Sequence, residues 1–384
     1  MNSTIKFLFY FAVLFVVSCT QPTDMLTVIN SDGSCYREFN SKADQAFLLG
    51  DTASKLNPFP VDIDSTWIVS WKFRNSEWFT QFPVRKSTVD SIVRSIKSKD
   101  KSKVDGEKKS DDFFVLARRN YSSVEELSTH FKLKKSHKWG DMKVKYELEK
   151  KFRWFYTYFI YRETYPKIKH NFEISIEKYM SKDEAMFWFT GKPDMLKGMN
   201  GVEAREYVGS LEDKYNKWVT FNSWNSEYKV LLANYSQIKK QPVSQARLAI
   251  LKDTIFDSKV KDLQDFNMEK ILNGYFKTNA FSLLWDGDDS PLVKFEKDFD
   301  EQGFMHLFTE SFNYKLIMPG EIIQPKDRIM QGDTITMNLT AYRMIPADYV
   351  IEAQSRKANV WAFILTGIIL LVAVGSFIWK PKRR

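Results

Sequence analysis

The sequence predicts an α+β fold: an antiparallel sheet built from N-terminal/central and C-terminal strands, with a helical section between them. Apolar residues alternate with charged ones over Met142–Leu148, as on a half-exposed strand. Helical periodicity then holds over residues 181–300. Strand-like alternation returns between residues 312 and 353. Strands from both sides of the helical section are therefore expected to meet in one sheet.

The chain opens with the pattern of a secretory signal peptide. Lys6 precedes the apolar run Phe7–Val17, which is too short to span a membrane, and Ser18 and Cys19 follow. The four residues Val16-Val17-Ser18-Cys19 resemble the lipobox of bacterial lipoproteins, in which the Cys is diacylated and becomes the mature N-terminus. The resemblance implies a signal peptide over residues 1–18 and lipidation of Cys19. Ordinary signal cleavage is the alternative.

Residues 19–65 show weak periodicity and two turn signals, Asn30–Gly33 and Asn57–Pro60. We expect a tether and an irregular N-terminal segment here. Cys35 is the second of only two cysteines, so it has no disulfide partner once Cys19 carries lipid. An incidental thiol is the simplest interpretation of Cys35, because the sequence reveals no neighbouring base that would activate it.

One extracytoplasmic α+β domain is expected over residues 66–357. Thr66–Phe82 is rich in Trp, Phe, Ile and Val and fits one or two strands. Residues 97–109 hold six Lys and three acidic residues with little that is apolar, which predicts a Lys/Ser-rich mobile loop.

The alternation that begins at Met142 continues to Tyr161, with aromatic residues on both faces of its second half. This length exceeds one strand, so a bend or tight hairpin is expected near Glu149–Lys151. Core packing is one interpretation of the aromatic ladder. The other is a ligand cavity for an acyl chain or glycan, for which the candidate binding residues are Trp154, Tyr156 and Tyr158.

Asp286, Asp288 and Asp289 form the densest acidic cluster, late in the helical section. Their oxygens would suit a hard cation such as calcium, although Lys297 stands where an EF-hand loop has its Glu. The alternative is a solvated turn whose acids lie at the positive end of the next helix, which begins at Ser290-Pro291.

Ala358–Trp379 contains no charged residue and is followed by the basic tail 380–384. Its length as a helix is roughly 33 Å at 1.5 Å per residue, enough to cross a hydrocarbon core of about 30 Å. We expect a transmembrane helix over residues 358–379, with Trp361 near one interface and the tail on the cytoplasmic side. A buried core helix is the alternative.

The C-terminal layout resembles that of LppM-type bacterial lipoproteins. It runs from a strand at Tyr314 through Pro319-Gly320-Glu321 and a turn at Gly332-Asp333 to paired strands and one membrane helix. Together with the lipobox, the resemblance implies an extracytoplasmic domain associated with the envelope and with lipid ligands. It brings no catalytic residues with it.

The formal net charge of +9 lies mostly in the 97–109 loop and the C-terminal tail, so we expect no nucleic-acid partner. The histidines lack the spacing of zinc ligands, and no GxSxG, GxGxxG or Walker motif occurs. The sequence therefore assigns no catalytic residue, metal or cofactor.

These features predict a bacterial cytoplasmic-membrane lipoprotein with a single membrane pass, anchored by lipid at Cys19, with an extracytoplasmic domain and a cytoplasmic C-terminus. We expect a non-catalytic binding or scaffold module whose partners are membrane lipid and an envelope protein. One alternative is a lipid- or glycolipid-binding protein with a cavity between sheet and helices. The other is an enzyme with a dispersed site.

Overall fold

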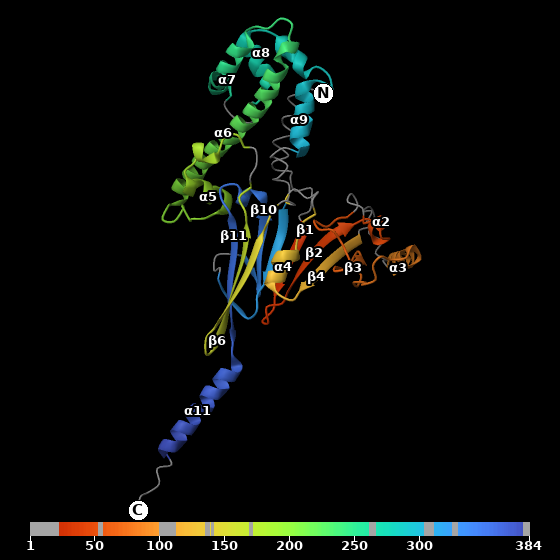
Figure 1. Ribbon diagram of the computed structural model, residues 1–384, viewed down its shortest axis with the longest axis vertical. Helices are drawn as coiled ribbons and strands as arrows, with labels where there is room; N and C mark the ends of the chain where they lie inside the picture. Colours follow the sequence, from red (N-terminus) through yellow and green to blue (C-terminus); the bar gives the residue numbers. More distant parts are fainter. Residues whose placement is uncertain are drawn as a thin grey trace, which may run out of the picture. The chain divides into compact units, whose positions relative to one another are not determined.

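The computed structural model of the chain describes residues 23–52, 57–99, 113–134, 139, 142–168, 172–260, 266–302, 311–324 and 329–378 (Figure 1). The chain divides into two compact units. Unit 1 contains Lys167–Glu310 and Thr340–Asp348, and unit 2 contains Pro22–Pro166, Ser311–Leu339 and Tyr349–Arg384. Unit 1 is helical and unit 2 holds the strands, which confirms the α+β class.

Unit 2 contains two sheets rather than the single antiparallel sheet that the sequence predicted. The larger has seven strands in the order β3-β4-β2-β1-β7-β10-β9, and the smaller has four in the order β5-β6-β11-β8. Their bounds are β1 Thr23–Ile29, β2 Cys35–Ala43, β3 Ile68–Phe73, β4 Phe113–Tyr121, β5 Lys145–Phe152, β6 Tyr156–Tyr165, β7 Ser311–Ile317, β8 Glu321–Gln324, β9 Ile329–Gln331, β10 Thr334–Thr340 and β11 Tyr349–Ala358.

The larger sheet is mixed, and the smaller one is antiparallel. β1 pairs antiparallel with β2 but parallel with β7, where Met25 faces Tyr314. In the smaller sheet β6 pairs antiparallel with both β5 and β11. The parallel pair β1·β7 joins strands that are almost 300 residues apart along the chain (Asp24 bonds Asn313). Alternation in the sequence reports burial and carries no information on strand direction, so it could not reveal this pair.

The expectation of an irregular segment over residues 19–65 was wrong for much of its length. β1 and β2 lie inside the larger sheet, and the predicted turn at Asn30–Gly33 connects them as a hairpin, with Gly33 at a φ of 100°. β1 has neighbours on both sides and buries Met25, Val28 and Ile29. Because its apolar residues do not alternate with polar ones, its period-two signal is weak.

Four described helices belong to unit 2: α2 Gln45–Leu48, α3 Lys86–Lys99, α4 Val124–His130 and α11 Val360–Ile378. The first three residues of the predicted mobile loop 97–109 end α3, and the rest lie outside the described residues. Cys35 is buried in β2, and burial raises the pKa of its thiol to about 12, so the thiol stays protonated and unreactive at neutral pH.

A fully buried ion pair connects the two sheets of unit 2. Arg37 of β2 donates from Nη2 to Oε1 of Glu163 in β6 at 2.6 Å, and both side chains have no exposed surface. Burial alone would lower the pKa of Arg37, but the facing carboxylate more than offsets this and holds the pKa above its usual range. Arg37 also donates to Thr27 Oγ1 at 2.8 Å and to Tyr146 Oη at 3.0 Å.

Three tyrosines complete the shell of the Glu163 carboxylate. Tyr161 and Tyr165 donate at 2.7 Å each, and Tyr314 from the larger sheet donates at 2.5 Å. Burial, and then the neighbouring carboxylate, raises the pKa of all three phenols well above the usual range, so they remain hydrogen-bond donors. The interior between the sheets is thus filled by a polar network whose members satisfy one another.

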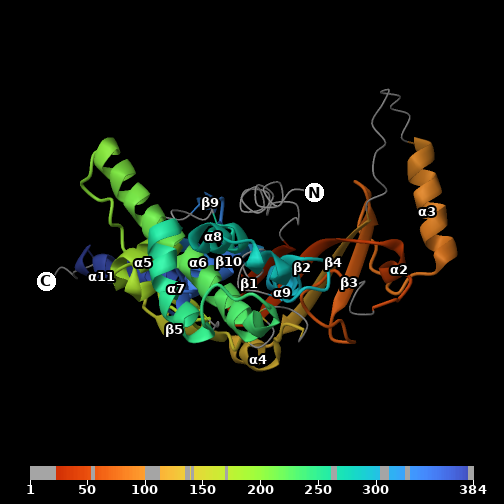
Figure 2. The ribbon, with the colours of Figure 1, turned by 90° about the horizontal axis from the view of Figure 1, so that it is seen from above.

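Unit 1 is built on the long helix α6, against which α7 and α9 pack (Figure 2). α6 runs unbroken for 34 residues within the predicted helical section, from a capping box formed by Asn200 and Glu203. The helix bounds are α5 Lys182–Thr190, α6 Gly201–Asn234, α7 Gln245–Lys259, α8 Met268–Phe276 and α9 Pro291–Gln302.

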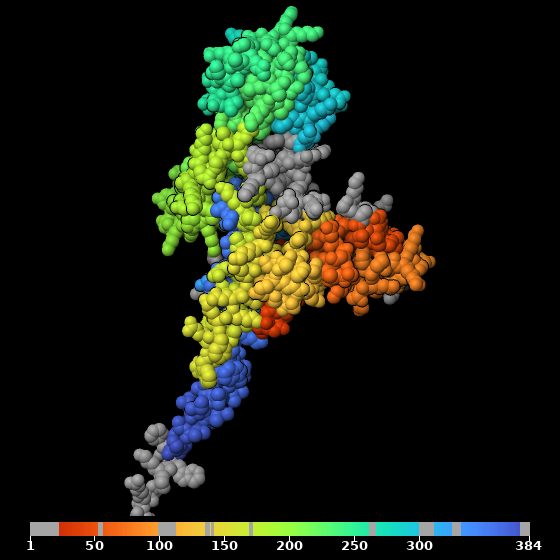
Figure 3. Space-filling model, viewed as in Figure 1, coloured from red at the N-terminus to blue at the C-terminus, as the bar shows by residue number. Residues whose placement is uncertain are grey.

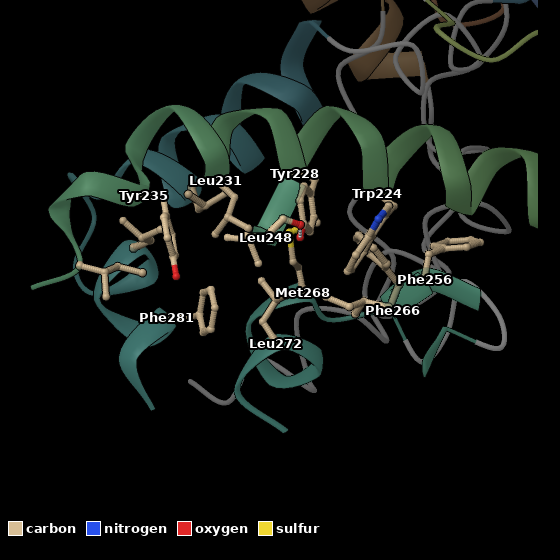
Figure 4. Packing of buried hydrophobic residues seen from close by; sticks show 14 of the residues in the cluster. Trp224, Tyr228, Leu231, Tyr235, Leu248, Phe256, Phe266, Met268, Leu272 and Phe281 are labelled. Atoms are coloured by element: carbon tan, nitrogen blue, oxygen red, sulfur yellow. Dashed lines mark hydrogen bonds between the residues drawn. The ribbon is translucent and has the colours of Figure 1, made fainter. Parts of the chain in front are cut away.

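The core of unit 1 is aromatic. Figure 4 shows side chains of α6 pointing toward those of α7 and α8. Tyr228 and Tyr235 place their rings in this core and donate to the backbone oxygens of Leu248 and Val243, each at 2.8 Å. The hydroxyls therefore keep partners although the rings are buried. The labelled residues are Trp224, Tyr228, Leu231, Tyr235, Leu248, Phe256, Phe266, Met268, Leu272 and Phe281.

One carboxyl group is buried beside this core. Glu227 of α6 is 6% exposed. Burial, followed by the nearby Glu296 of α9, raises the pKa of Glu227 well above its ordinary value. Trp285 Nε1 donates to Glu296 at 3.0 Å. The raised pKa means that Glu227 holds its proton to a higher pH in the folded chain than in the unfolded one.

Replacing Glu163 by Gln should destabilise unit 2 by about 3–5 kcal/mol, because Arg37 would stay charged and buried without a counter-charge. Tyr165→Phe, which removes one hydrogen bond to the same carboxylate, should cost about 1.5–3 kcal/mol. Urea unfolding of the full chain, followed by hydrogen exchange in β2 and β6, measures both. Equal losses in the two variants would contradict the ion-pair interpretation.

The stability of unit 1 should fall as the pH rises from about 5 through neutrality. The pKa of Glu227 is higher in the folded chain than in the unfolded one, so the folded chain holds a proton that the unfolded chain has released. Glu227→Gln should raise the free energy of unfolding at pH 7 more than at pH 5, by about 1.4 kcal/mol for each unit by which folding raises the pKa of Glu227. Urea unfolding at the two pH values measures the difference. Glu206→Gln, at an exposed position of the same helix, is the matched control. A pH slope that survives in Glu227→Gln would disprove the assignment.

Candidate functional site

The β5–β6 hairpin ends in an exposed aromatic tip, defined here as residues 152–155. Phe152, Trp154 and Phe155 are between 38% and 59% exposed, although large aromatic side chains are normally buried. Arg153 N donates to Tyr156 O at 2.8 Å and closes the turn. The turn lies a few residues beyond Glu149–Lys151, where the sequence predicted it.

Asn359 fastens helix α11 to the aromatic tip. It is the single residue between β11 and α11, and its backbone N donates to Phe155 O at 2.8 Å. Its Nδ2 donates to Arg153 O at 2.8 Å, and its Oδ1 accepts from Thr157 at 2.9 Å. The start of α11 is therefore fixed by side-chain and backbone bonds rather than by a flexible linker.

Aromatic side chains extend this junction along the first turns of α11. Trp154 Nε1 donates to Thr366 Oγ1 at 2.9 Å. The rings of Trp154 and Trp361 lie 5.3 Å apart, and those of Phe155 and Phe363 lie 4.7 Å apart. Because Thr366 is about two helical turns into α11, the tip and the first part of this helix form one apolar surface.

Beyond the tip, α11 is uncovered on all sides. Its large apolar residues are 40% to 75% exposed, and these include the five consecutive positions Ile368–Val372. Successive helical residues are separated by about 100°, so five in a row point around the whole circumference. Figure 3 shows this helix, in blue, projecting from the end of the hairpin.

Within the described residues, whose side chains in α11 reach Ser376, no helix combines the length and the apolarity needed to cross a membrane. The transmembrane helix over residues 358–379 therefore stays a prediction. Trp379 and the basic tail 380–384 lie outside the described residues.

The structure places the three candidate ligand residues in different surroundings. Trp154 is at the exposed tip. Tyr156 is half-buried, packed against Phe363 and under the Arg356 guanidinium. Tyr158 lines a hollow with a volume of about 520 Å³, whose lining does not include Trp154 or Tyr156. The aromatic ladder is thus partly core and partly surface, and the three residues do not share one cavity.

The other predicted sites receive no support as ligand sites. Asp288 and Asp289 are almost fully exposed and pair with Lys297 and Lys294 at 3.3 and 3.0 Å. Among the described residues no group of three or more His, Cys, Asp or Glu side chains is placed to hold a metal ion. Cys19 lies outside the described residues, so its lipidation stays a prediction.

Positive charge surrounds the aromatic tip. Lys150, Lys151, Arg153, Arg356 and Lys357 all lie on the last residues of β5, in the turn or on the last residues of β11. The carboxylates near them are those of Asp32, Glu149 and Glu321. Cations outnumber acids here, which suits a surface that meets anionic groups. The sequence signal for this site was the run Phe152-Arg153-Trp154-Phe155, which breaks the alternation with aromatic residues on both faces.

Asn359→Ala should loosen the tip from α11 and raise amide hydrogen exchange at Arg153–Thr157. Each of the hydrogen bonds lost is worth about 0.5–1.5 kcal/mol. Asn359→Asp keeps the acceptor for Thr157 but loses both Nδ2 donors, so it should have an intermediate effect. Hydrogen exchange mass spectrometry on the full chain makes the comparison. Unchanged exchange in Asn359→Ala would show that the aromatic contacts alone hold the junction.

No protein-family model, no curated protein and no solved structure matches this chain. The site itself is therefore the basis for assigning a function.

Proposed function

We propose that this chain is a membrane-anchored envelope lipoprotein whose extracytoplasmic part serves as a non-catalytic binding or scaffold module. The observation that carries the proposal is the apolar surface of α11, exposed around its whole circumference and continuous with the aromatic tip. Such a surface in water would cost about 25 cal/mol for each Å² left uncovered. It needs an apolar environment.

A lipid bilayer suits this surface better than a protein partner does. A helix that docks on another protein usually buries one stripe and keeps charged residues on its opposite face. The uncharged run Ala358–Trp379 has no charged face, part of it lying beyond the described residues. Trp and Tyr favour the headgroup level of a membrane, where Trp154 and Trp361 would then lie.

The space between the two sheets of unit 2 is filled, which favours a scaffold over a binder that holds its ligand in a cavity at this place. A lipid or glycolipid binder with a cavity between sheet and helices stays the alternative prediction. Where such a cavity would lie, Arg37, Glu163 and the tyrosines around them occupy the space with fully buried side chains. A binding role would therefore use the surface of the protein. The lipobox-like Val16–Cys19 supports a second anchor, two acyl chains on Cys19.

Cys19→Ala should abolish acylation without releasing the protein, because the C-terminal helix still anchors it. Deletion of residues 358–384 should also leave the protein bound, through the acyl chains. Only the combined variant should become soluble. Metabolic labelling with a fatty acid and fractionation after an alkaline wash give the two readouts.

Release of Cys19→Ala into the soluble fraction would contradict a membrane-embedded C-terminal helix. Unchanged labelling in that variant would contradict lipidation at Cys19. The two anchors are thus tested separately.

A further inference from the structure

The aromatic tip adjoins a hollow on the outer face of the four-stranded sheet. Its volume is about 520 Å³, and its lining is Lys151, Arg153, Tyr158, Ile160 and Gln354. The lining holds two cations and no carboxylate. It also holds a phenol and an amide, which can each donate a hydrogen bond.

The register of the sheet explains why these residues gather. Lys151 of β5 stands opposite Tyr158 of β6, and Tyr158 stands opposite Arg356 of β11. Residues directly opposite one another point to the same face, so the three side chains form a row across the sheet. The row lies four residues before the start of α11.

The cations of the hollow and of the row differ in whether they already pair with a carboxylate. Lys151 pairs with Glu149 at 3.0 Å, with both side chains about half exposed, and Arg356 pairs with Glu321 at 2.8 Å. Exposed pairs of this kind contribute little stability and exchange readily. The Arg153 guanidinium makes no ion pair or side-chain hydrogen bond within the described residues. It is available for a new anionic partner.

We propose that this hollow binds the headgroup of one anionic phospholipid. The inference rests on the proposed function, because the tip and α11 bring a bilayer to the hollow. With Trp154 at the headgroup level, Lys151 and Arg153 lie beside the phosphates of the same leaflet. The planar Arg153 guanidinium can form a two-pronged hydrogen bond with a phosphodiester, Lys151 adds a point charge, and Tyr158 donates a hydrogen bond.

The test uses the full chain reconstituted into nanodiscs of phosphatidylcholine with a minor fraction of phosphatidylglycerol. Native mass spectrometry measures the ratio of the two lipids that leave the disc with the protein. We expect phosphatidylglycerol to be enriched on the natural protein. Lys151→Gln and Arg153→Gln should each lower the enrichment about fivefold. Arg153→Lys keeps the charge but loses the two-pronged hydrogen bond, so its enrichment should lie between those of the natural protein and Arg153→Gln.

Lys145→Gln is the matched control, because Lys145 lies on the same strand and face as Lys151 but at the opposite end of β5, paired with Glu147. Its enrichment should equal that of the natural protein. Equal losses of phosphatidylglycerol enrichment in Lys145→Gln and Arg153→Gln would overturn the proposal, because they would show that the overall positive charge, and not the hollow, attracts the lipid. Displacement of the lipid by inorganic phosphate would overturn the assignment to a lipid headgroup.

The two proposals fail in different ways. Protein that enters the nanodiscs without enriching phosphatidylglycerol overturns the headgroup site and leaves the membrane anchor intact. Protein that does not enter the discs overturns both. Unfolding temperatures equal to that of the natural protein confirm that the exposed substitutions leave the fold unchanged.

Discussion

The buried pair Arg37–Glu163 is the constraint on which unit 2 depends. It joins the two sheets with opposite charges that have no access to water, so each charge requires the other. The Arg37 guanidinium also donates hydrogen bonds to Thr27 and Tyr146, and the Glu163 carboxylate accepts hydrogen bonds from three tyrosine hydroxyls. A shift of either sheet would separate a buried charge from its partners. We infer that the network favours one arrangement of the sheets over other packings of similar apolar content.

Strand β6 connects the buried ion pair to the aromatic tip. Glu163 lies near one end of β6 and the tip follows from the other, about 23 Å away at 3.3 Å per residue. β6 pairs with β11 along its full ten residues, from Tyr165 opposite Tyr349 to Tyr156 opposite Ala358. A ribbon held on both sides in this way is stiff. Asn359 leads directly from β11 into α11, so the core of unit 2 positions the exposed apolar surface of this helix.

Unit 1 is connected to unit 2 through strands of both sheets. The chain leaves unit 2 after β6 and returns at β7, then leaves after β10 and returns at β11. The second of these segments, Thr340–Asp348, packs within unit 1. Its residue Ile345 belongs to a buried cluster, and the ring centroids of Tyr342 and Phe189 lie 6.4 Å apart. Within the described residues the chain therefore passes between the two units four times.

The sequence by itself determined the features that depend on local periodicity: the α+β class, the helical section, strands β3, β5, β6, β7, β10 and β11, and the uncharged run that contains α11. Only the tertiary structure decided the rest. β1 escaped notice because apolar residues stand on both of its faces, so its alternation is weak. β2 escaped notice because its buried face carries the charged residue Arg37 between Cys35 and Phe39. Arg37 and Glu163 look like solvent-facing charges in the sequence, since their pairing spans 126 residues. Trp154 and Tyr158 share one alternating ladder, yet the turn at 153–155 places one at an exposed tip and the other in a hollow. Periodicity in the sequence shows which residues share a face of a strand or helix. Pairing between distant segments of the chain decides whether that face contacts protein or solvent.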